Sequence, residues 1–317
     1  MTYITAFFAS PVHVAIAVIY GLLIAASAIT WVLRKLRPGE ATTELSKRVV
    51  SWWWMITVFT IAILTDRVVS SIFLGFVSFL ALKEYLSLIP TRRVDRSILL
   101  WAYLAIPVQF YFAYIGRFGL FMTFIPVWMF LFLPARITLG GHTEGFLRAV
   151  GLLSWGLMIT VFSLSHTALL LSYGVVHGHG AGALLFLVAL TQFNDVAQFT
   201  FGRLFGVHKI TPSVSPKKTW EGFVGGLVAT ACVATIVGPY LTPMPVIWSG
   251  AAGAIIAAAG FLGDVTMSSF KRDMGVKDTS QLIPGHGGIL DRVDSLIYSA
   301  PVFFHFLNFF FWSPLAR

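Results

Sequence analysis

Residues 246–263 read VIWSGAAGAIIAAAGFLG, an apolar run without a charged residue. A helix needs about 20 such residues to cross a bilayer, with a range of about 17–25. Similar runs recur near residues 10–33, 50–65, 67–82, 98–115, 118–133, 147–171, 181–201, 222–241 and 295–312. We therefore predict an all-α, polytopic transmembrane helical protein with about 9–10 spans. The runs at 50–65, 67–82 and 118–133 are short for a span.

Composition supports this fold class. Of 317 residues, 57% are hydrophobic and only 11% are charged, whereas soluble domains carry roughly 25% charged residues. A mean hydropathy of +0.83 excludes a soluble globule, because too few polar residues exist to cover its surface. The single cysteine, Cys232, excludes an intrachain disulfide. The net charge of +9 suits anionic lipid or polyphosphate in a membrane protein, and we expect no nucleic-acid partner.

The basic residues are distributed unevenly between the two sides. With the N-terminus outside, nineteen of the 22 lysines and arginines fall on one side, and the exceptions are Arg67, Arg117 and Arg317. The positive-inside rule makes the basic side cytoplasmic. We divide the chain into N-terminal helices (1–97), middle helices (98–180) and a C-terminal catalytic transmembrane domain (181–317). Cytoplasmic loops are predicted at 202–221 and 264–294.

One tryptophan cluster and one histidine pair also stand out in the sequence. Trp52, Trp53 and Trp54 begin a span beside two basic residues, which is typical of an interfacial aromatic anchor. His177 and His179 could ligate zinc, but they fall on the outer side and the sequence places no third ligand near them.

The segment from Gly263 to Ser295 concentrates polar chemistry. Five of the 13 acidic residues in the chain fall within it, interleaved with lysine, arginine and histidine. Carboxylates that converge offer the hard oxygen ligands that suit Mg²⁺, which binds through one or two of them and completes its shell with water and substrate phosphate. The neighbouring cations would then contact phosphate oxygens.

The positions of three aspartates suggest a metal site. Asp264 ends one apolar span, and Asp294 begins the next with Asp291 one helical turn before it. We predict that Asp264, Asp291 and Asp294 line one pocket at the cytoplasmic mouth of two helices and bind the metal. As an alternative, Asp291 and Asp294 could be helix N-terminal charges that the dipole favours, which leaves Asp264 unexplained.

Three further features point to phosphate binding. The Pro284-Gly285-His286-Gly287-Gly288 turn could present backbone N–H groups to an anion. Ser215-Pro216-Lys217-Lys218 places two lysines before a span, although positive-inside anchoring would also explain them. Asp195 lies within a span, where a carboxylate is costly and by default a functional candidate.

These residues resemble the signature of the phosphatidate cytidylyltransferases, the CDP-diacylglycerol synthases. The similarity covers about sixty residues, and it combines Ser268, Lys271, Arg272, Lys277, Asp278, 284–288, Asp291, Arg292 and Asp294 with Asp195, Ala197, Gly202, Arg203, Gly206 and most of 215–222. Gln198 stands where many members have an aromatic residue, which resembles a divergent branch.

The resemblance implies that CTP and phosphatidic acid give CDP-diacylglycerol and pyrophosphate with Mg²⁺, and a second metal ion fits the same logic. It implies a homodimer in a bacterial inner membrane with its site facing the cytoplasm. Asp264, Asp291, Asp294 and Lys271 would be catalytic. The predicted substrate-binding residues are Asp195, Ser215, Lys217, Lys218, Ser268, Arg272, Lys277, Asp278, His286, Gly287, Gly288 and Arg292.

Two other functions remain open on the sequence. A CTP-dependent lipid kinase would phosphorylate a polyprenol or diacylglycerol hydroxyl and release CDP instead of pyrophosphate. A transporter is compatible with the span count and with Asp195, but the sequence shows no internal repeat, and its charges gather on one face.

Overall fold

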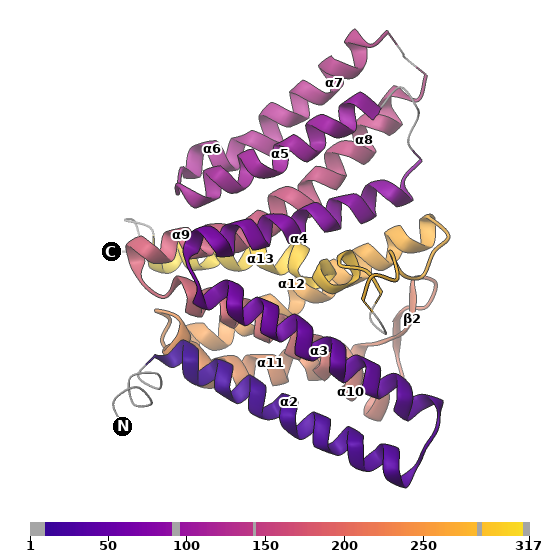
Figure 1. The fold of residues 1–317 in the computed structure, drawn as a ribbon, viewed down its shortest axis with the longest axis vertical. Coiled ribbons are helices and arrows are strands. Elements are labelled where there is room, and N and C mark those ends of the chain that lie inside the picture. The colour runs from indigo at the N-terminus through magenta and orange to yellow at the C-terminus, as the bar shows by residue number, and fades with distance from the viewer. Residues whose placement is uncertain (1–9, 91–95, 142–143, 284–286, 313–317) are drawn as a thin grey trace.

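The computed structural model describes residues 10–90, 96–141, 144–283 and 287–312, which fold into long helices and one short hairpin (Figure 1). The elements are α2 (Pro11–Leu36), α3 (Glu40–Leu64), α4 (Arg67–Leu88), α5 (Arg96–Tyr114), α6 (Phe118–Thr123), η2 (Phe124–Met129), α7 (Phe130–Leu139), α8 (Phe146–Leu157), η3 (Met158–Ser163), α9 (Leu164–His177), α10 (Gly180–Phe205), β1 (Lys209–Thr211), β2 (Ser215–Thr219), α11 (Trp220–Leu241), α12 (Val246–Asp273), α13 (Leu290–Leu307) and η4 (Asn308–Trp312).

Within the described residues, nine helices are long and apolar enough to cross a membrane, and α5 adds a shorter apolar helix at Ile98–Tyr114. The π-helical segments η2, η3 and η4 continue their neighbours, so that α6 to α7 and α8 to α9 each count as one span. The predicted all-α polytopic fold and its span count are therefore confirmed.

The spans predicted near 50–65 and 67–82 are longer than expected. α3 has 25 residues and α4 has 22, because both continue into more polar sequence at the same end of the molecule. Their other ends meet at a tight turn, where the Asp66 side chain accepts a hydrogen bond from the Val68 amide at 3.1 Å and caps α4. The polar Asp66-Arg67 pair thus marks a helix boundary at the opposite end.

The connections between helices gather at two ends. At the right of Figure 1 lie the α2–α3 turn, the β-hairpin and the α12–α13 connection, and the α3–α4, α5–α6, α9–α10 and α11–α12 turns lie at the left. Arg67 and Arg117 border turns of the second group, and Arg317 lies outside the described residues. The helices therefore alternate in direction as the basic-residue pattern predicted.

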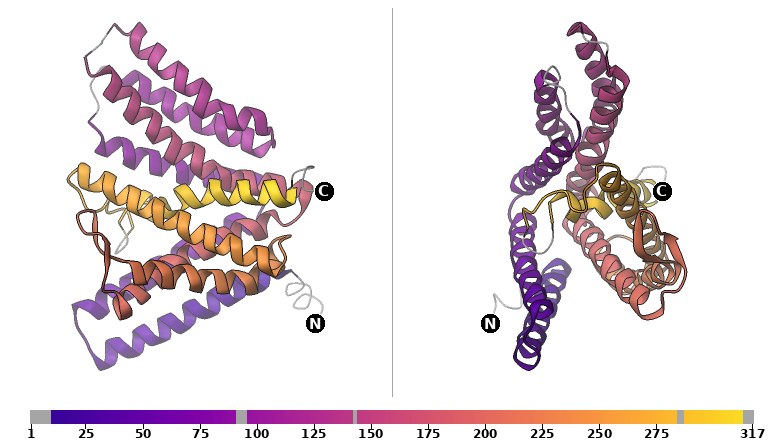
Figure 2. Two further views of the ribbon diagram at one scale, coloured as in Figure 1. Left: turned by 180° about the vertical axis from the view of Figure 1, so that it is seen from behind. Right: turned by 90° about the vertical axis from the view of Figure 1, so that its right-hand side faces the viewer.

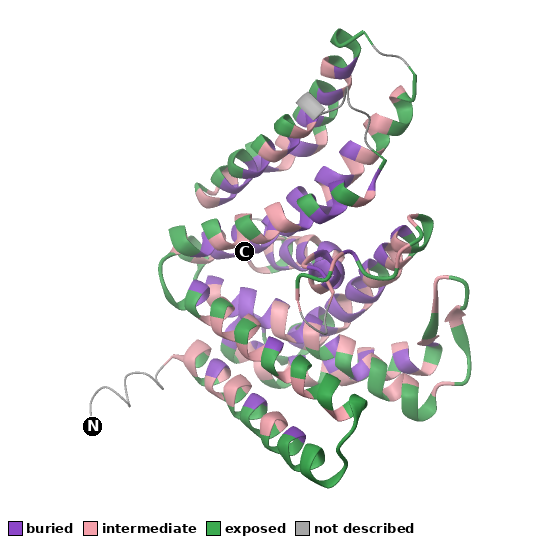
Figure 3. Ribbon diagram, turned by 45° about the vertical axis from the view of Figure 1, so that its right-hand side comes forward, coloured by how far each residue is buried: buried purple, intermediate pink, exposed green. Residues whose placement is uncertain are grey.

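The protein core lies where α4, α9 and α13 meet (Figures 2 and 3). Leu82, Leu169 and Phe303 are among its fully buried side chains. The α2–α3 hairpin and the α10–α12 group extend from this centre as two arms (Figure 2, right). The active-site candidates come mainly from α10, α12, α13 and the β1–β2 hairpin.

Both predicted cytoplasmic loops contain more regular structure than expected. α12 continues for nine residues beyond Asp264, because Met267 and Phe270 extend its buried face. α13 begins at Leu290, so the connection is only 274–289. Within 202–221, β1 and β2 pair antiparallel, with Lys209 opposite Thr219.

Candidate active site

Two lysine–aspartate pairs connect the elements of the site. Lys218, on β2, places its Nζ atom 2.5 Å from Asp264 Oδ2 on α12. Lys271, two turns further along α12, places its Nζ atom 2.7 Å from Asp291 Oδ1 and 4.0 Å from Asp294 Oδ2 on α13. The side chains of Lys271 and Asp291 are only 11% and 4% exposed. The structure thus brings all four predicted catalytic residues into one region.

Glycine at one position allows α12 and α13 to approach closely. A Cβ atom on Gly263 would lie 2.5 Å from the Asp294 carbonyl oxygen, so a larger residue would separate the helices. Asp264, which directly follows this contact, is therefore held close to Asp294. Asp264 follows the apolar run, as the sequence indicated, but α12 does not end there and continues to Asp273.

Asp291 is engaged by its own connection. Its Oδ1 atom accepts from Lys271, and its Oδ2 atom accepts from the Thr279 amide at 2.8 Å and the Gly288 amide at 2.9 Å. The Thr279 hydroxyl lies 2.9 Å from both Asp291 Oδ2 and Glu84 Oε2, and its one proton is donated to one of them at a time. In this structure Asp291 therefore holds the 274–289 connection, and its role as a metal ligand stays a prediction.

Three other carboxylates lie near one another. Asp294 is close enough to Asp264 and Asp195 for their negative charges to repel, and the Asp195 carboxylate accepts a hydrogen bond from Ser295 at 3.2 Å. Over the described residues, no three His, Cys, Asp or Glu side chains are arranged to hold a metal ion. Asp264, Asp294 and Asp195 have the hard oxygen donors that Mg²⁺ prefers, and Asp264 is also bonded to Lys218.

The glycine turn does not present a free anion nest in the residues that are described. The Gly288 amide donates to Asp291, and the Ile289 and Leu290 amides donate to Glu84 at 3.0 and 2.9 Å. Gly287 adopts φ +77°, and a Cβ atom there would lie 2.6 Å from Asp291 Oδ2. Gly287 and Gly288 therefore let the backbone pack on carboxylates, and the predicted phosphate cradle stays a prediction, because 284–286 lie outside the described residues. His286 lies outside the described residues.

Glu84, near the end of α4, is a residue that sequence reasoning missed. It is 7% exposed, and besides the two amides it accepts hydrogen bonds from the Thr279 hydroxyl at 2.9 Å and the Ser280 hydroxyl at 2.8 Å. Glu84 and Asp291 thus both contact Thr279 within the connection and backbone amides at its C-terminal end. The only sequence signal was an acidic residue at the end of an apolar span, which usually indicates an interface position.

Two adjoining cavities contain most of the predicted substrate-binding residues. The larger, of about 780 Å³, is lined by Lys277, Asp278, Gly287 and Arg292 among others. The smaller, of about 190 Å³, is lined by Ser215, Lys217, Lys218 and Asp264 among others. Asp195 and Phe199 line both. The intramembrane carboxylate that the sequence singled out therefore lies where the two cavities meet.

Three predicted binding residues have structural contacts instead. Ser268 donates to Asp264 Oδ1 at 3.2 Å. The Arg272 Nε atom donates to the Val214 carbonyl at 3.3 Å, which connects α12 to the hairpin. Gly288 packs against Glu84 and Thr279.

The α3 helix contributes a wall that the sequence did not predict. Glu44, Arg48 and Trp52 line the larger cavity, and Arg48 pairs with Glu44 at 2.5 Å. Of the three tryptophans interpreted as an interfacial anchor, Trp54 is 70% exposed, whereas Trp53 donates to the Ser27 hydroxyl at 3.0 Å. The three tryptophans therefore lie in different environments: Trp52 at the larger cavity, Trp53 against α2 and Trp54 on the exposed surface.

Comparison with known proteins gives both long and partial matches. A profile described as "Cytidylyltransferase family" matches residues 46–310. The protein named "Uncharacterized protein YnbB" of Escherichia coli K12 is 42% identical over 295 residues, which are 93% of this chain and 97% of that protein.

Relatives with an assigned activity match over a shorter region. The phosphatidate cytidylyltransferase of Haemophilus influenzae is 44% identical over 136 residues, which are 41% of this chain and 47% of that enzyme. The phosphatidate cytidylyltransferase of Mycobacterium bovis is 38% identical over 148 residues, or 44% and 47% of the two chains. The match thus spans about half the length of these curated enzymes.

Proposed function

The chain belongs to the cytidylyltransferase family, and we propose that it transfers CMP from CTP to phosphatidic acid, giving CDP-diacylglycerol and pyrophosphate. The observation that carries this proposal is that the two cavities meet at Asp195, which lies within the membrane helix α10. The charged side chains of these cavities suit a nucleoside triphosphate. Because the protein is an integral membrane protein, a lipid head group can reach the cavities from the bilayer.

The charges of the cavities suit two polyanions. Lys217 and Lys218 line the smaller cavity, and Lys277, Arg292 and Arg48 line the larger. CTP and phosphatidate repel each other, so cations on both sides must offset that repulsion before the reacting atoms can approach. In phosphoryl transfer, positioning and electrostatic stabilisation supply most of the catalysis, and these side chains provide both.

The reaction needs little acid–base chemistry from the protein. A phosphate oxygen of phosphatidate attacks the α-phosphorus of CTP, the bond from that phosphorus to the bridging oxygen breaks, and pyrophosphate leaves with the electron pair. Because the attacking phosphate is already ionised, no residue has to remove a proton. Lys218 and Lys271 would stabilise the charge that develops on the phosphate oxygens.

Asp264 and Asp294 would hold Mg²⁺ in this site, with Asp195 near both. When bound, the ion would neutralise phosphate charge and hold the triphosphate in place. Asp264 would be released for this role if Lys218 bound a substrate phosphate instead. Asp291 would instead hold the 274–289 connection in position.

We also propose that the protein lies in the inner membrane of a bacterial cell, and that the end bearing the β1–β2 hairpin faces the cytoplasm. The one-sided basic residues support this orientation, and the relatives with long or partial matches are bacterial. A homodimer is proposed from the family resemblance alone.

Purified protein should convert CTP labelled at the α-phosphate, together with phosphatidate, into a labelled lipid in the presence of Mg²⁺. Asp264→Asn should lower this rate about ten- to a hundredfold, because one lost interaction with a charged group corresponds to about 1.5–3 kcal/mol and 1.4 kcal/mol to tenfold. Asp273→Asn, an exposed aspartate on the same helix, is the matched control.

Failure of the wild-type protein to form any labelled lipid with Mg²⁺ would reject the proposed function. Release of CDP, with phosphate transferred to a lipid hydroxyl, would indicate a kinase.

A further inference from the structure

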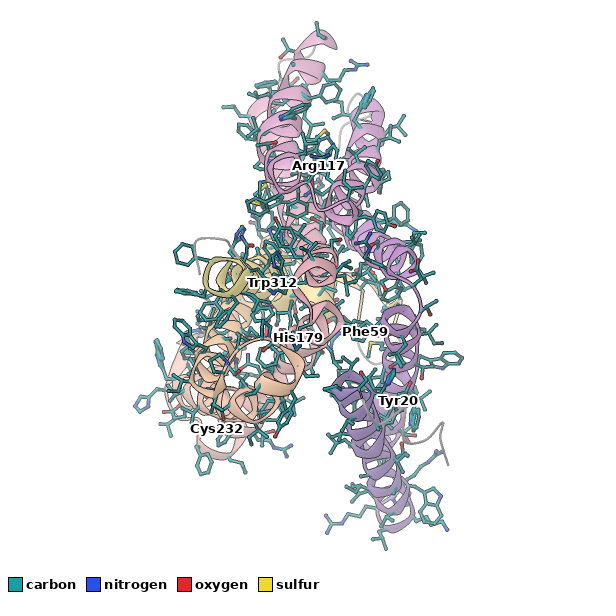
Figure 4. All side chains as sticks on the ribbon, turned by 90° about the vertical axis from the view of Figure 1, so that its left-hand side faces the viewer. Tyr20, Phe59, Arg117, His179, Cys232 and Trp312 are labelled. Atoms are coloured by element: carbon teal, nitrogen blue, oxygen red, sulfur yellow. The ribbon has the colours of Figure 1, made fainter. Side chains whose placement is uncertain are left out.

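An apolar cavity of about 160 Å³ lies between the α2–α3 hairpin and α10. Its walls include Ile56, Phe59 and Ile63 from α3 and Leu185, Val188 and Ala189 from α10. Figure 4 shows the α2–α3 arm diverging from the α10–α12 arm, with Phe59 on the side where the two approach. Neither the catalytic chemistry nor the ion pairs of the site require this groove.

The groove opens into the larger polar cavity. Trp52 on α3 and Gln192 on α10 line both of them. Gln192 precedes Asp195 by one helical turn, so the mouth of the groove lies beside the point where the two polar cavities meet. A molecule with a phosphate head in the polar cavity would therefore have its apolar part directed into the groove.

The mouth of the groove carries groups that suit a phosphate. Arg292 lines the polar cavity, and within the described part of the chain its buried Nε atom has no hydrogen-bond partner. Arg48 lies on the facing helix α3. A guanidinium group presents several N–H donors in a geometry that suits phosphate, and both arginines line the same cavity.

The groove is long enough to hold much of an acyl chain. From Trp52 to Ile63, α3 advances about 16 Å at 1.5 Å per residue. Ile63 is the second-last residue of α3, so a chain whose head group lies beside Arg292 would follow α3 towards the turn that precedes α4.

We infer that the groove between α3 and α10 binds one acyl chain of the lipid-phosphate substrate. The inference rests on the proposed function and gives the N-terminal hairpin a role as a wall of the substrate site. Transfer of an acyl chain from the bilayer into an apolar groove gains little free energy, since lipid tails are as apolar as the groove. The groove therefore positions the head group and discriminates chain length instead of adding affinity.

The test is a Thr60→Trp variant, which fills the groove about 12 Å along α3 from Trp52. A palmitoyl chain must pass this level, and a hexanoyl chain ends before it. We expect turnover of dipalmitoyl phosphatidate to fall at least tenfold, with dihexanoyl phosphatidate and the KM for CTP changed less than twofold. Ala25→Trp, on an exposed position of α2, should leave both lipids unaffected.

Each other outcome overturns the inference. Equal losses for both lipids would mean that the variant acts on the fold or on the catalytic site, and no loss for either would mean that the groove holds bulk lipid. Wild-type protein that converts neither lipid would instead reject the proposed function on which the inference rests.

A second measurement does not depend on the variant. Wild-type protein is irradiated with a phosphatidate that carries a photoreactive diazirine in one palmitoyl chain. The label should appear in 56–63 and 185–189, and dipalmitoyl phosphatidate should compete for it better than phosphatidylcholine does. Labelling spread evenly over the lipid-exposed faces, including α2, would refute the groove.

Discussion

Glu84 provides the sharpest test of how the site is held together. Each of its oxygens has one hydroxyl and one backbone amide within hydrogen-bond distance: Ser280 and Ile289 at Oε1, and Thr279 and Leu290 at Oε2. In Glu84→Gln, one oxygen becomes an NH₂ group. The backbone amide beside it then faces another donor, whereas the neighbouring hydroxyl can turn and accept.

The structure allows the size of this effect to be estimated. A hydrogen bond to a charged group contributes about 1.5–3 kcal/mol, so the loss of one would cost about 1.5–3 kcal/mol while the connection stays in place. The connection would avoid that cost by moving away from Glu84. At 1.4 kcal/mol per tenfold, we expect kcat/KM to fall about ten- to a hundredfold.

The assay combines lipid product formation with limited trypsin digestion. Cleavage after the exposed Lys277 should become faster in Glu84→Gln, because the connection that contains it is released, while the helical content of the bundle stays unchanged. Ser78→Ala is the matched control, since Ser78 is a buried residue of the same helix that donates to the Thr160 carbonyl at 2.7 Å. Activity of Glu84→Gln within twofold of wild type, or equal to that of Ser78→Ala, would refute the reasoning.

Three other predictions concern the turn, the orientation and the metal. Gly287→Ala should lower activity more than Gly275→Ala, because both adopt positive φ but only the Gly287 Cβ would meet a carboxylate; equal losses would contradict the packing argument. In a Cys232→Ser background, a membrane-impermeant maleimide should label His179→Cys in intact cells and Ser213→Cys only after lysis, and the reverse pattern would invert the orientation. Chelation of Mg²⁺ should abolish turnover without lowering the thermal unfolding temperature, whereas unfolding on chelation would indicate a structural ion.

The fold could be predicted from the sequence because a bilayer imposes strong local constraints. Apolar runs of sufficient length must be helices, and the distribution of basic residues predicted that successive helices run in opposite directions. Helix ends were harder to predict, because packing and not composition decides them. Beyond Asp264, α12 continues through a charged stretch because Met267 and Phe270 remain in the core.

The membership of the site was predictable, and the roles within it were less so. Lys218, Lys271 and the aspartates were identified by their rarity in an apolar chain, and the structure brings them together. Spacing alone, however, could not show that Asp291 faces backbone amides whereas Asp294 lies near Asp195. Those differences depend on the path of the 274–289 connection, which local sequence patterns do not encode.

The site also depends on a contact that no local pattern reveals. Glu84 and Leu290 are separated by 206 residues, yet their hydrogen bond joins α4 to the first turn of α13. A buried carboxylate is costly unless donors surround it, so Glu84 is stable only when the connection is in place, and the connection is held only while Glu84 accepts from it. This mutual requirement couples the N-terminal helices to the position of Asp291, and through Lys271 to Asp294. The helices that carry no predicted catalytic residue therefore determine whether those residues can meet.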